Sequence, residues 1–142
     1  MLTKATLFAA LGAIALAAPA FAQDVAKGEK EFNKCKTCHM IVAPDGTEIV
    51  KGAKTGPNLY GVIGRPVASY EGFDYGDGIL AYGATGAVWD EALLAEYVVD
   101  PAKFLKEKTG DSKARSKMAF KLAKGGPDIA AYLASVAPAA TP

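Results

Sequence analysis

Apolar and small residues recur every three or four positions in two segments of the chain, 24–36 and 127–138. This spacing places them on one face of a helix, so each segment is predicted to form an amphipathic helix. The residues on these two faces are Val25, Gly28, Phe32, Cys35, Ile129, Tyr132, Leu133 and Val136.

Two more helices are predicted on either side of Pro101. Asp90 can cap a helix that runs to about Asp100, because its carboxylate can accept hydrogen bonds from the first-turn N–H groups. Pro101 can then open a shorter helix through Leu105, since the N–H that proline lacks would have no partner in a first turn.

The helical pattern fails between Met40 and Val88, where glycines and prolines are interleaved with aromatic residues and neither a useful helix nor a strand is visible. Such a long connection is uncommon inside a compact domain. Four short helices also make a poor core by themselves. The sequence therefore predicts an all-α domain whose long irregular loops wrap a large, flat, apolar group that the chain itself does not contain.

The first residues are typical of an export signal. Lys4 gives a positive start, the apolar run 5–18 is too short to span a bilayer, and Ala20-Phe21-Ala22 is typical of a cleavage site. We expect residues 1–22 to be a cleaved signal peptide and residues 23–142 to form one domain in the periplasm, with no membrane span after processing. A signal anchor that stays attached is the alternative.

Both cysteines and the single histidine lie within five consecutive residues. On a helix, Cys35 and Cys38 share a face and can reach one edge of a porphyrin while His39 turns toward the metal. Cys-x-x-Cys-His is the attachment signature of c-type haem. A thioredoxin-like dithiol would need a βαβ context that is not visible, and a structural zinc site would need a fourth ligand of Cys or His type.

The second axial ligand of a haem iron would have to be a methionine, because no second histidine exists. Met1 would leave with the signal peptide and Met40 adjoins His39, so Met118 is the candidate. Ligation by histidine and methionine suits electron transfer and raises the reduction potential. The alternative is that Met118 fills a gap in the core and leaves the iron five-coordinate.

Several short motifs, in chain order, resemble those of class I cytochromes c, and most closely the cytochrome c2 branch of photosynthetic and related bacteria. The resemblance covers essentially all of residues 23–142 and implies the small haem-wrapping class I cytochrome c fold with crossed N- and C-terminal helices. The matching residues are Gly28, Phe32, Cys35-Lys36-Thr37-Cys38-His39, Thr55-Gly56-Pro57-Asn58-Leu59-Tyr60-Gly61, Gly64-Arg65, Trp89, Lys117-Met118-Ala119-Phe120 and Tyr132-Leu133.

The same resemblance implies several further roles. Pro57 would offer its carbonyl to the His39 ring, Tyr97 would lie near the Met118 sulfur, and Gly28 and Phe32 would pack against Tyr132. The residues expected to line the haem propionates are Arg65, Tyr75 and Trp89. The plain alternatives are a turn at Pro57, a solvated charge at Arg65 and ordinary core aromatics at the other positions.

The chain departs from the shortest members of this family in three segments. Segments 43–54 and 106–114 carry extra residues, as in longer cytochromes c2, and segment 79–88 matches poorly. We therefore infer no haem contact from residues 79–88.

Charge is divided along the chain. There are 16 basic and 15 acidic side chains, and removal of Lys4 with the signal peptide would make them equal. Residues 66–102 carry seven acids and no Lys or Arg, whereas residues 103–124 carry eight bases against two acids. This basic block flanks Met118, so we expect it to steer the protein toward an acidic partner rather than to be only a solvated face. The expected docking residues are Lys103, Lys106, Lys113, Arg115, Lys117, Lys121 and Lys124.

These features predict a monomeric one-electron carrier with one covalently attached haem c. The resemblance implies that it takes electrons from a cytochrome bc complex and delivers them to a photosynthetic reaction centre or a terminal oxidase; no nucleic-acid partner is expected. One rival is an enzyme or gas sensor in which Met118 is displaced, and another is a thiol oxidoreductase without haem. Peroxidase chemistry would need a distal acid–base residue, and no second histidine can serve.

Overall fold

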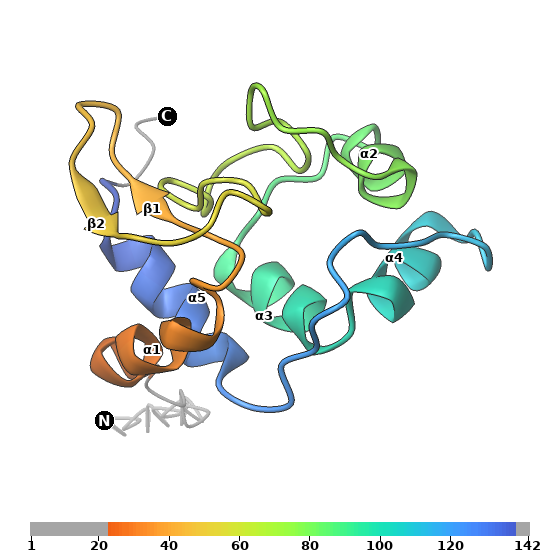
Figure 1. The fold of residues 1–142 in the computed structure, drawn as a ribbon. Helices are drawn as coiled ribbons and strands as arrows, with labels where there is room; N and C mark the ends of the chain where they lie inside the picture. Colours follow the sequence, from red (N-terminus) through yellow and green to blue (C-terminus); the bar gives the residue numbers. More distant parts are fainter. Residues whose placement is uncertain (1–22, 139–142) are drawn as a thin grey trace, which may run out of the picture.

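A computed structural model of the chain describes residues 23–138. Within this range it forms five α-helices, one 3-10 turn and a two-stranded antiparallel hairpin (Figure 1). The elements are α1 (Val25–Glu31), η1 (Phe32–Lys34), β1 (Ile41–Val42), β2 (Glu48–Val50), α2 (Asp77–Gly83), α3 (Glu91–Val99), α4 (Pro101–Thr109) and α5 (Gly126–Ser135). The expected signal peptide, residues 1–22, lies outside the described part of the chain.

The two terminal helices cross in direct contact, as the family resemblance implies (Figure 1). The rings of Phe32 and Tyr132 are 5.8 Å apart, and the Asp24 N–H donates to Oδ1 of Asp128 at 3.0 Å. Gly28 lies at the crossing point, where an added Cβ would lie 1.9 Å from the carbonyl oxygen of Asp128. Only glycine allows the two backbones to approach this closely.

The two middle helices begin as the sequence predicts, and α3 ends where expected, but α4 continues beyond Leu105 to Thr109. The Asp90 carboxylate accepts from the Leu93 N–H at 2.6 Å, and Pro101 occupies the first turn of α4. Asp100 caps α4 by accepting from the Lys103 N–H at 3.1 Å.

The prediction that residues 40–88 contain neither a helix nor a strand is wrong in two places. The strands β1 and β2 are two and three residues long, too short to show alternation. Helix α2 has seven residues, and two of them are Gly78 and Gly83, which weaken helical propensity. Both glycines allow close packing. A Cβ added at Gly78 would lie 2.3 Å from the carbonyl oxygen of Arg115, and one added at Gly83 would lie 2.5 Å from the carbonyl oxygen of Val67.

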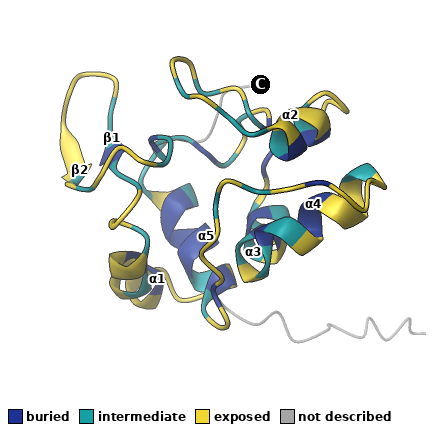
Figure 2. Ribbon diagram, turned by 45° about the vertical axis from the view of Figure 1, so that its right-hand side comes forward, coloured by how far each residue is buried: buried dark blue, intermediate teal, exposed yellow. Residues whose placement is uncertain are grey.

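Helix α5 is the most deeply buried element, because it packs against both α1 and α3 (Figure 2). A second part of the core is aromatic: the Trp89 and Phe104 rings each lie within 5.3 Å of Tyr97, and Tyr82 from α2 packs on Phe104 at 5.3 Å. No helix in the described range is long and apolar enough to cross a membrane.

Candidate functional site

The cysteine motif forms a tight turn directly after α1 and η1. The Cys35 N–H donates to the Phe32 carbonyl at 2.8 Å, and the His39 N–H donates to the Cys35 carbonyl at 2.9 Å. This winding leaves Cys35 half-buried and Cys38 exposed, with no disulfide between them. Because Phe32 is anchored against α5, the crossing of the terminal helices fixes where the motif lies.

The His39 ring is held by a loop that approaches from residues 52–57. Its Nδ1 atom lies 2.8 Å from the Pro57 carbonyl oxygen. Since a carbonyl can only accept a hydrogen bond, Nδ1 carries the ring proton and Nε2 keeps a free lone pair. Burial lowers the pKa of His39, and the bond to Pro57 acts in the opposite sense. The ring is therefore held as the neutral tautomer that can ligate a metal.

Two glycines let this loop come close to His39. An added Cβ at Gly56 would lie 2.4 Å from the Cε1 atom of the ring, and one at Gly52 would lie 1.8 Å from the His39 carbonyl oxygen. The Gly56 N–H also donates to the Cys38 carbonyl at 2.7 Å. The sequence Thr55-Gly56-Pro57 therefore acts as one unit that orients the imidazole.

Arg65 is partly buried, and its guanidinium makes hydrogen bonds to the backbone. Its guanidinium donates to the carbonyls of Asn58, at 3.0 Å, and of Tyr60. It also lies 5.0 Å from the centre of the Tyr70 ring. Burial lowers its pKa, and no Asp or Glu among residues 23–138 pairs with it. A half-buried cation without a carboxylate partner is a natural site for an anionic group of a ligand.

Tyr75 and Trp89 both lie next to Arg65. The Tyr70 N–H donates to the Tyr75 hydroxyl at 3.3 Å, so the two tyrosines and the guanidinium form one group. Burial raises the pKa of Tyr75, which stays a neutral donor. The Trp89 N–H donates to the Arg65 carbonyl at 2.9 Å, and its ring is buried against Tyr97.

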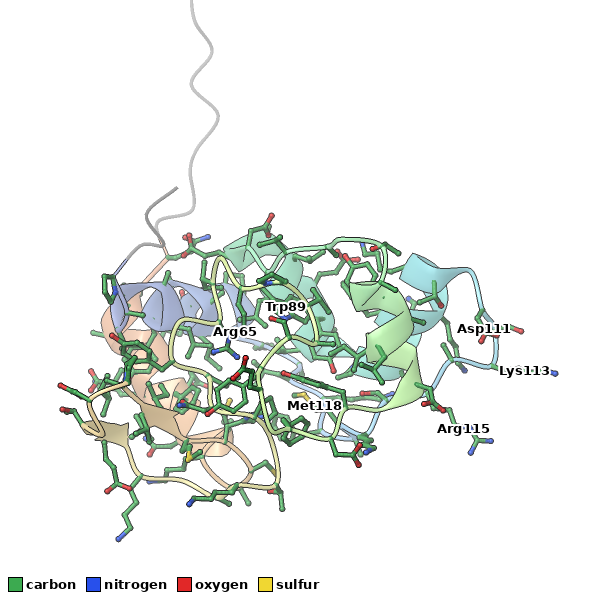
Figure 3. The ribbon with its side chains drawn as sticks, turned by 90° about the horizontal axis from the view of Figure 1, so that it is seen from above. Arg65, Trp89, Asp111, Lys113, Arg115 and Met118 are labelled. Carbon is green, nitrogen blue, oxygen red and sulfur yellow. The ribbon has the colours of Figure 1, made fainter. Side chains whose placement is uncertain are left out.

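Met118 lies on a loop between α4 and α5 and packs, partly buried, against the core. Figure 3 shows Met118 in the middle of the molecule with Arg65 and Trp89. The Met118 N–H donates to the Ser116 hydroxyl at 3.1 Å, and that hydroxyl lies 3.5 Å from the hydroxyl of Tyr97. Burial raises the pKa of Tyr97, so its phenol remains protonated. Tyr97 is thus linked to the Met118 loop through a serine.

The comparisons with known proteins give a consistent result. No protein-family model matches the chain. It is 69% identical over 128 residues to cytochrome c2 of Rhodobacter capsulatus, which covers 90% of this chain and 93% of the relative. It is 57% identical over 139 residues to cytochrome c-550 of Paracoccus denitrificans, which covers 95% and 90%. The solved structure of the Rhodobacter capsulatus protein has a TM-score of 0.79 at 70% identity and covers 80% of this chain and 97% of that chain.

The chain belongs to the cytochrome c2 branch of class I cytochromes c. As a cytochrome c2 it carries one covalently attached haem c and is an electron carrier, not an enzyme. The residues described above fit this group, since the site offers two thiols, a neutral imidazole, a thioether and an unpaired guanidinium. The enzyme alternative is thereby ruled out.

The dithiol alternative also disagrees with the thiol chemistry. Burial raises the pKa of the Cys35 thiol to about 11, opposed by the nearby charge of Lys34. A thioredoxin-like dithiol needs the reverse, a thiol whose pKa is lowered so that the thiolate forms readily. The thiol chemistry therefore does not favour a redox-active dithiol.

Three further residues support the site and were assigned no role from the sequence. Asn58 is buried. Its Oδ1 accepts a hydrogen bond from the Val42 N–H at 3.0 Å, and its Nδ2 donates one to the Val42 carbonyl at 2.8 Å. Tyr70 and Ser116 complete the groups around Arg65 and Met118. Asn58 lies inside the Thr55–Gly61 motif, so its position could have been noted, whereas nothing local in the sequence indicates Tyr70.

Proposed function

We propose that this cytochrome c2 is a soluble periplasmic carrier in which His39 and Met118 are the two axial ligands of the haem iron. The observation that carries this proposal is the hydrogen bond from His39 Nδ1 to the Pro57 carbonyl, at 2.8 Å. It leaves Nε2 as the ligating atom, and such bonds raise the basicity of a metal-bound imidazole. The haem supplies a one-electron couple between ferrous and ferric iron.

The remaining site residues would bind and orient the group. Cys35 and Cys38 would form the two thioether bonds, and Arg65, Tyr75 and Trp89 would line the propionates. Arg65 supports this role because its charge lacks a carboxylate partner among the described residues. Tyr97 would act on Met118 through Ser116.

The basic block would dock the carrier on a cytochrome bc complex and then on a photosynthetic reaction centre or a terminal oxidase. Not all of its members are equally available. Figure 3 shows Lys113 and Arg115 projecting from the edge of the molecule. Lys103, Lys117 and Lys121 instead pair with Glu107, Asp74 and Asp100, at 3.7, 2.7 and 2.6 Å. Docking is therefore expected to depend most on the bases that form no ion pair within residues 23–138, namely Lys106, Lys113, Arg115 and Lys124.

The test is the absorption spectrum of the haem-loaded protein, oxidised and reduced, for the natural chain and Met118→Ala. Ligation by Met118 gives a weak near-infrared sulfur-to-iron band in the oxidised natural protein, and the substitution abolishes it. Met40→Ala is the matched control, because it removes the other thioether near the site and should leave the band in place. A high-spin spectrum that is indifferent to Met118→Ala would reject the proposed ligand.

A further inference from the structure

The loop that carries Met118 is held on one side by the corner between α3 and α4. The Leu122 N–H donates to the Val98 carbonyl at 2.8 Å, and the Lys121 ammonium lies 2.6 Å from Oδ2 of Asp100. The other oxygen of Asp100 caps α4. This side of the loop, after Met118, is therefore fixed to the ends of two helices.

On the other side, before Met118, the loop lies against residues 74–78. The Lys117 ammonium donates to both the carbonyl oxygen and the carboxylate of Asp74, at 2.9 and 2.7 Å. The Lys117 ammonium is thus held by Asp74, and Lys117 is the residue directly before the proposed iron ligand, Met118.

The backbones of these two segments also approach closely. A Cβ at Gly78 would lie 2.3 Å from the Arg115 carbonyl oxygen, and one at Gly76 would lie 3.1 Å from Cγ of Lys117. A carbonyl oxygen cannot move without moving the loop, whereas a lysine stem can rotate away. Gly78 is therefore the position at which the fit between α2 and the Met118 loop is tightest.

Two other contacts among the described residues support this side of the loop: the Ser116 hydroxyl lies 3.5 Å from that of Tyr97, and Ala114 is buried in the core. Beyond these contacts, α2 and residues 109–117 enclose an open cavity of about 720 Å³, whose walls include Ala81, Thr109 and Asp111. Next to this cavity, the residues directly before Met118 are held by their contacts with residues 74–78 together with the Ser116–Tyr97 contact.

We propose that residues 74–78 are a positioning segment for Met118: their contacts with Arg115 and Lys117 hold the loop closed and keep the thioether on the iron. The inference rests on the ligation by Met118 proposed above. Within this segment Tyr75 is already expected to line the haem propionates. The new role belongs to Asp74 and Gly78, for which the sequence suggested no part in the haem site.

The probe is imidazole, which binds ferric iron on this side only when Met118 has left it. Its apparent affinity rises with the population of the open loop. Gly78→Ala should tighten imidazole binding about tenfold. The added methyl group overpacks the contact with the Arg115 carbonyl and destabilises the closed loop, which changes the equilibrium constant between closed and open loop by roughly a factor of ten. Asp74→Asn should tighten it about twofold, because the ion pair is exposed and one backbone acceptor remains for Lys117.

Two matched controls separate positioning from general destabilisation. Gly83→Ala adds the same methyl to the same helix against a carbonyl oxygen at 2.5 Å, but that oxygen belongs to Val67. Glu96→Gln removes the same charge as Asp74→Asn from an ion pair of 3.0 Å with Lys108, between α3 and α4. Both controls should leave the imidazole affinity unchanged even where they lower the melting temperature.

If the natural protein shows the near-infrared band, Met118 is its ligand. Equal imidazole affinities for Gly78→Ala and Gly83→Ala would then overturn the positioning role of residues 74–78 without affecting the proposed ligation. If Gly78→Ala does not fold, Asp74→Asn is compared with Glu96→Gln instead. Equal imidazole affinities for these two variants would overturn the inference. If the natural protein shows no sulfur-to-iron band, the proposed ligation fails and the positioning role fails with it.

Discussion

The Nδ1 atom of His39 lies 2.8 Å from the carbonyl oxygen of Pro57, a residue 18 positions later in the chain. The contact is possible because Gly56 passes over the face of the imidazole without a side chain. A loop without helical or strand periodicity therefore decides the tautomer and the orientation of the proposed proximal ligand.

Gly56→Ala should disturb this arrangement. Its Cβ would lie 2.4 Å from Cε1 of His39, so the ring or the loop must move. We expect a loss of about 1 to 3 kcal/mol in the free energy of unfolding, together with an altered haem spectrum. Denaturant unfolding followed by absorption measures both effects. Gly46 has a φ of +89°, so Gly46→Ala also costs stability, but its added Cβ has no neighbour within 4 Å and the spectrum should stay unchanged. An unaltered spectrum in Gly56→Ala would contradict the prediction.

Gly28→Ala should be among the most damaging single changes in the chain. The added methyl would lie 1.9 Å from the Asp128 carbonyl oxygen, between two backbones that cannot separate without uncovering Phe32 and Tyr132. We expect the free energy of unfolding to fall by about 3 kcal/mol. Thermal melting of the haem-loaded protein tests this, with Ala26→Gly, on the exposed face of the same helix, as the control. A melting temperature for Gly28→Ala no lower than that of the control would show that the crossing can adjust.

The contact between α1 and α5 should also be sensitive to acid. The hydrogen bond from the Asp24 N–H and the ion pair with Lys27 hold the pKa of Asp128 below its usual range. A carboxylate with a lowered pKa in the folded state stabilises the protein above its unfolded pKa. That stabilisation is lost as the pH falls from about 4 through the lower pKa of the folded state.

Asp128→Asn should therefore narrow the difference between the unfolding free energies measured by denaturant titration at pH 7 and at pH 3. Glu29→Gln removes an acid from the exposed side of α1 and is the control. An equal dependence on pH in the natural chain and in Asp128→Asn would exclude Asp128 as a source of the acid sensitivity.

The two outward-pointing bases offer a test of docking. Changing Lys113 and Arg115 to Gln should slow association with a solubilised cytochrome bc complex several-fold at low ionic strength, and the difference should shrink as salt screens the charges. Stopped-flow oxidation and reduction kinetics measure this. The matched control changes Lys103 and Lys108 to Gln, because both are already paired with glutamates. A greater loss of rate in the control would place the docking surface elsewhere.

Four of the five described helices could be predicted from the sequence because their signals are local. Asp90 and Asp100 accept first-turn hydrogen bonds, and α5 has an unbroken apolar face. Helix α2 could not be predicted, since Gly78 and Gly83 weaken the helix by themselves and are explained only by carbonyl groups from distant segments. In α2, close packing against these carbonyl groups therefore outweighs the low helix propensity of the two glycines.

The site residues can also be divided into those with a local sequence signal and those without one. Cys35, Cys38 and His39 are identified by spacing alone, whereas the group of Arg65, Tyr70 and Tyr75 depends on how a loop folds back on itself. The family resemblance supplied two of these three residues and missed Tyr70. The basic block was visible as a count of charges, but the sequence could not show that Lys117 and Lys121 are already paired.

The crossing of α1 and α5 has a consequence for the order of events during biogenesis. A ribosome makes the N-terminal end first, so α1 waits for its principal partner until the last helix has been synthesised. Contacts between such distant parts of a chain also form slowly. Until α5 has docked on α1, the cysteine motif next to α1 therefore remains accessible to the attachment reaction, and this access ends when the two helices close.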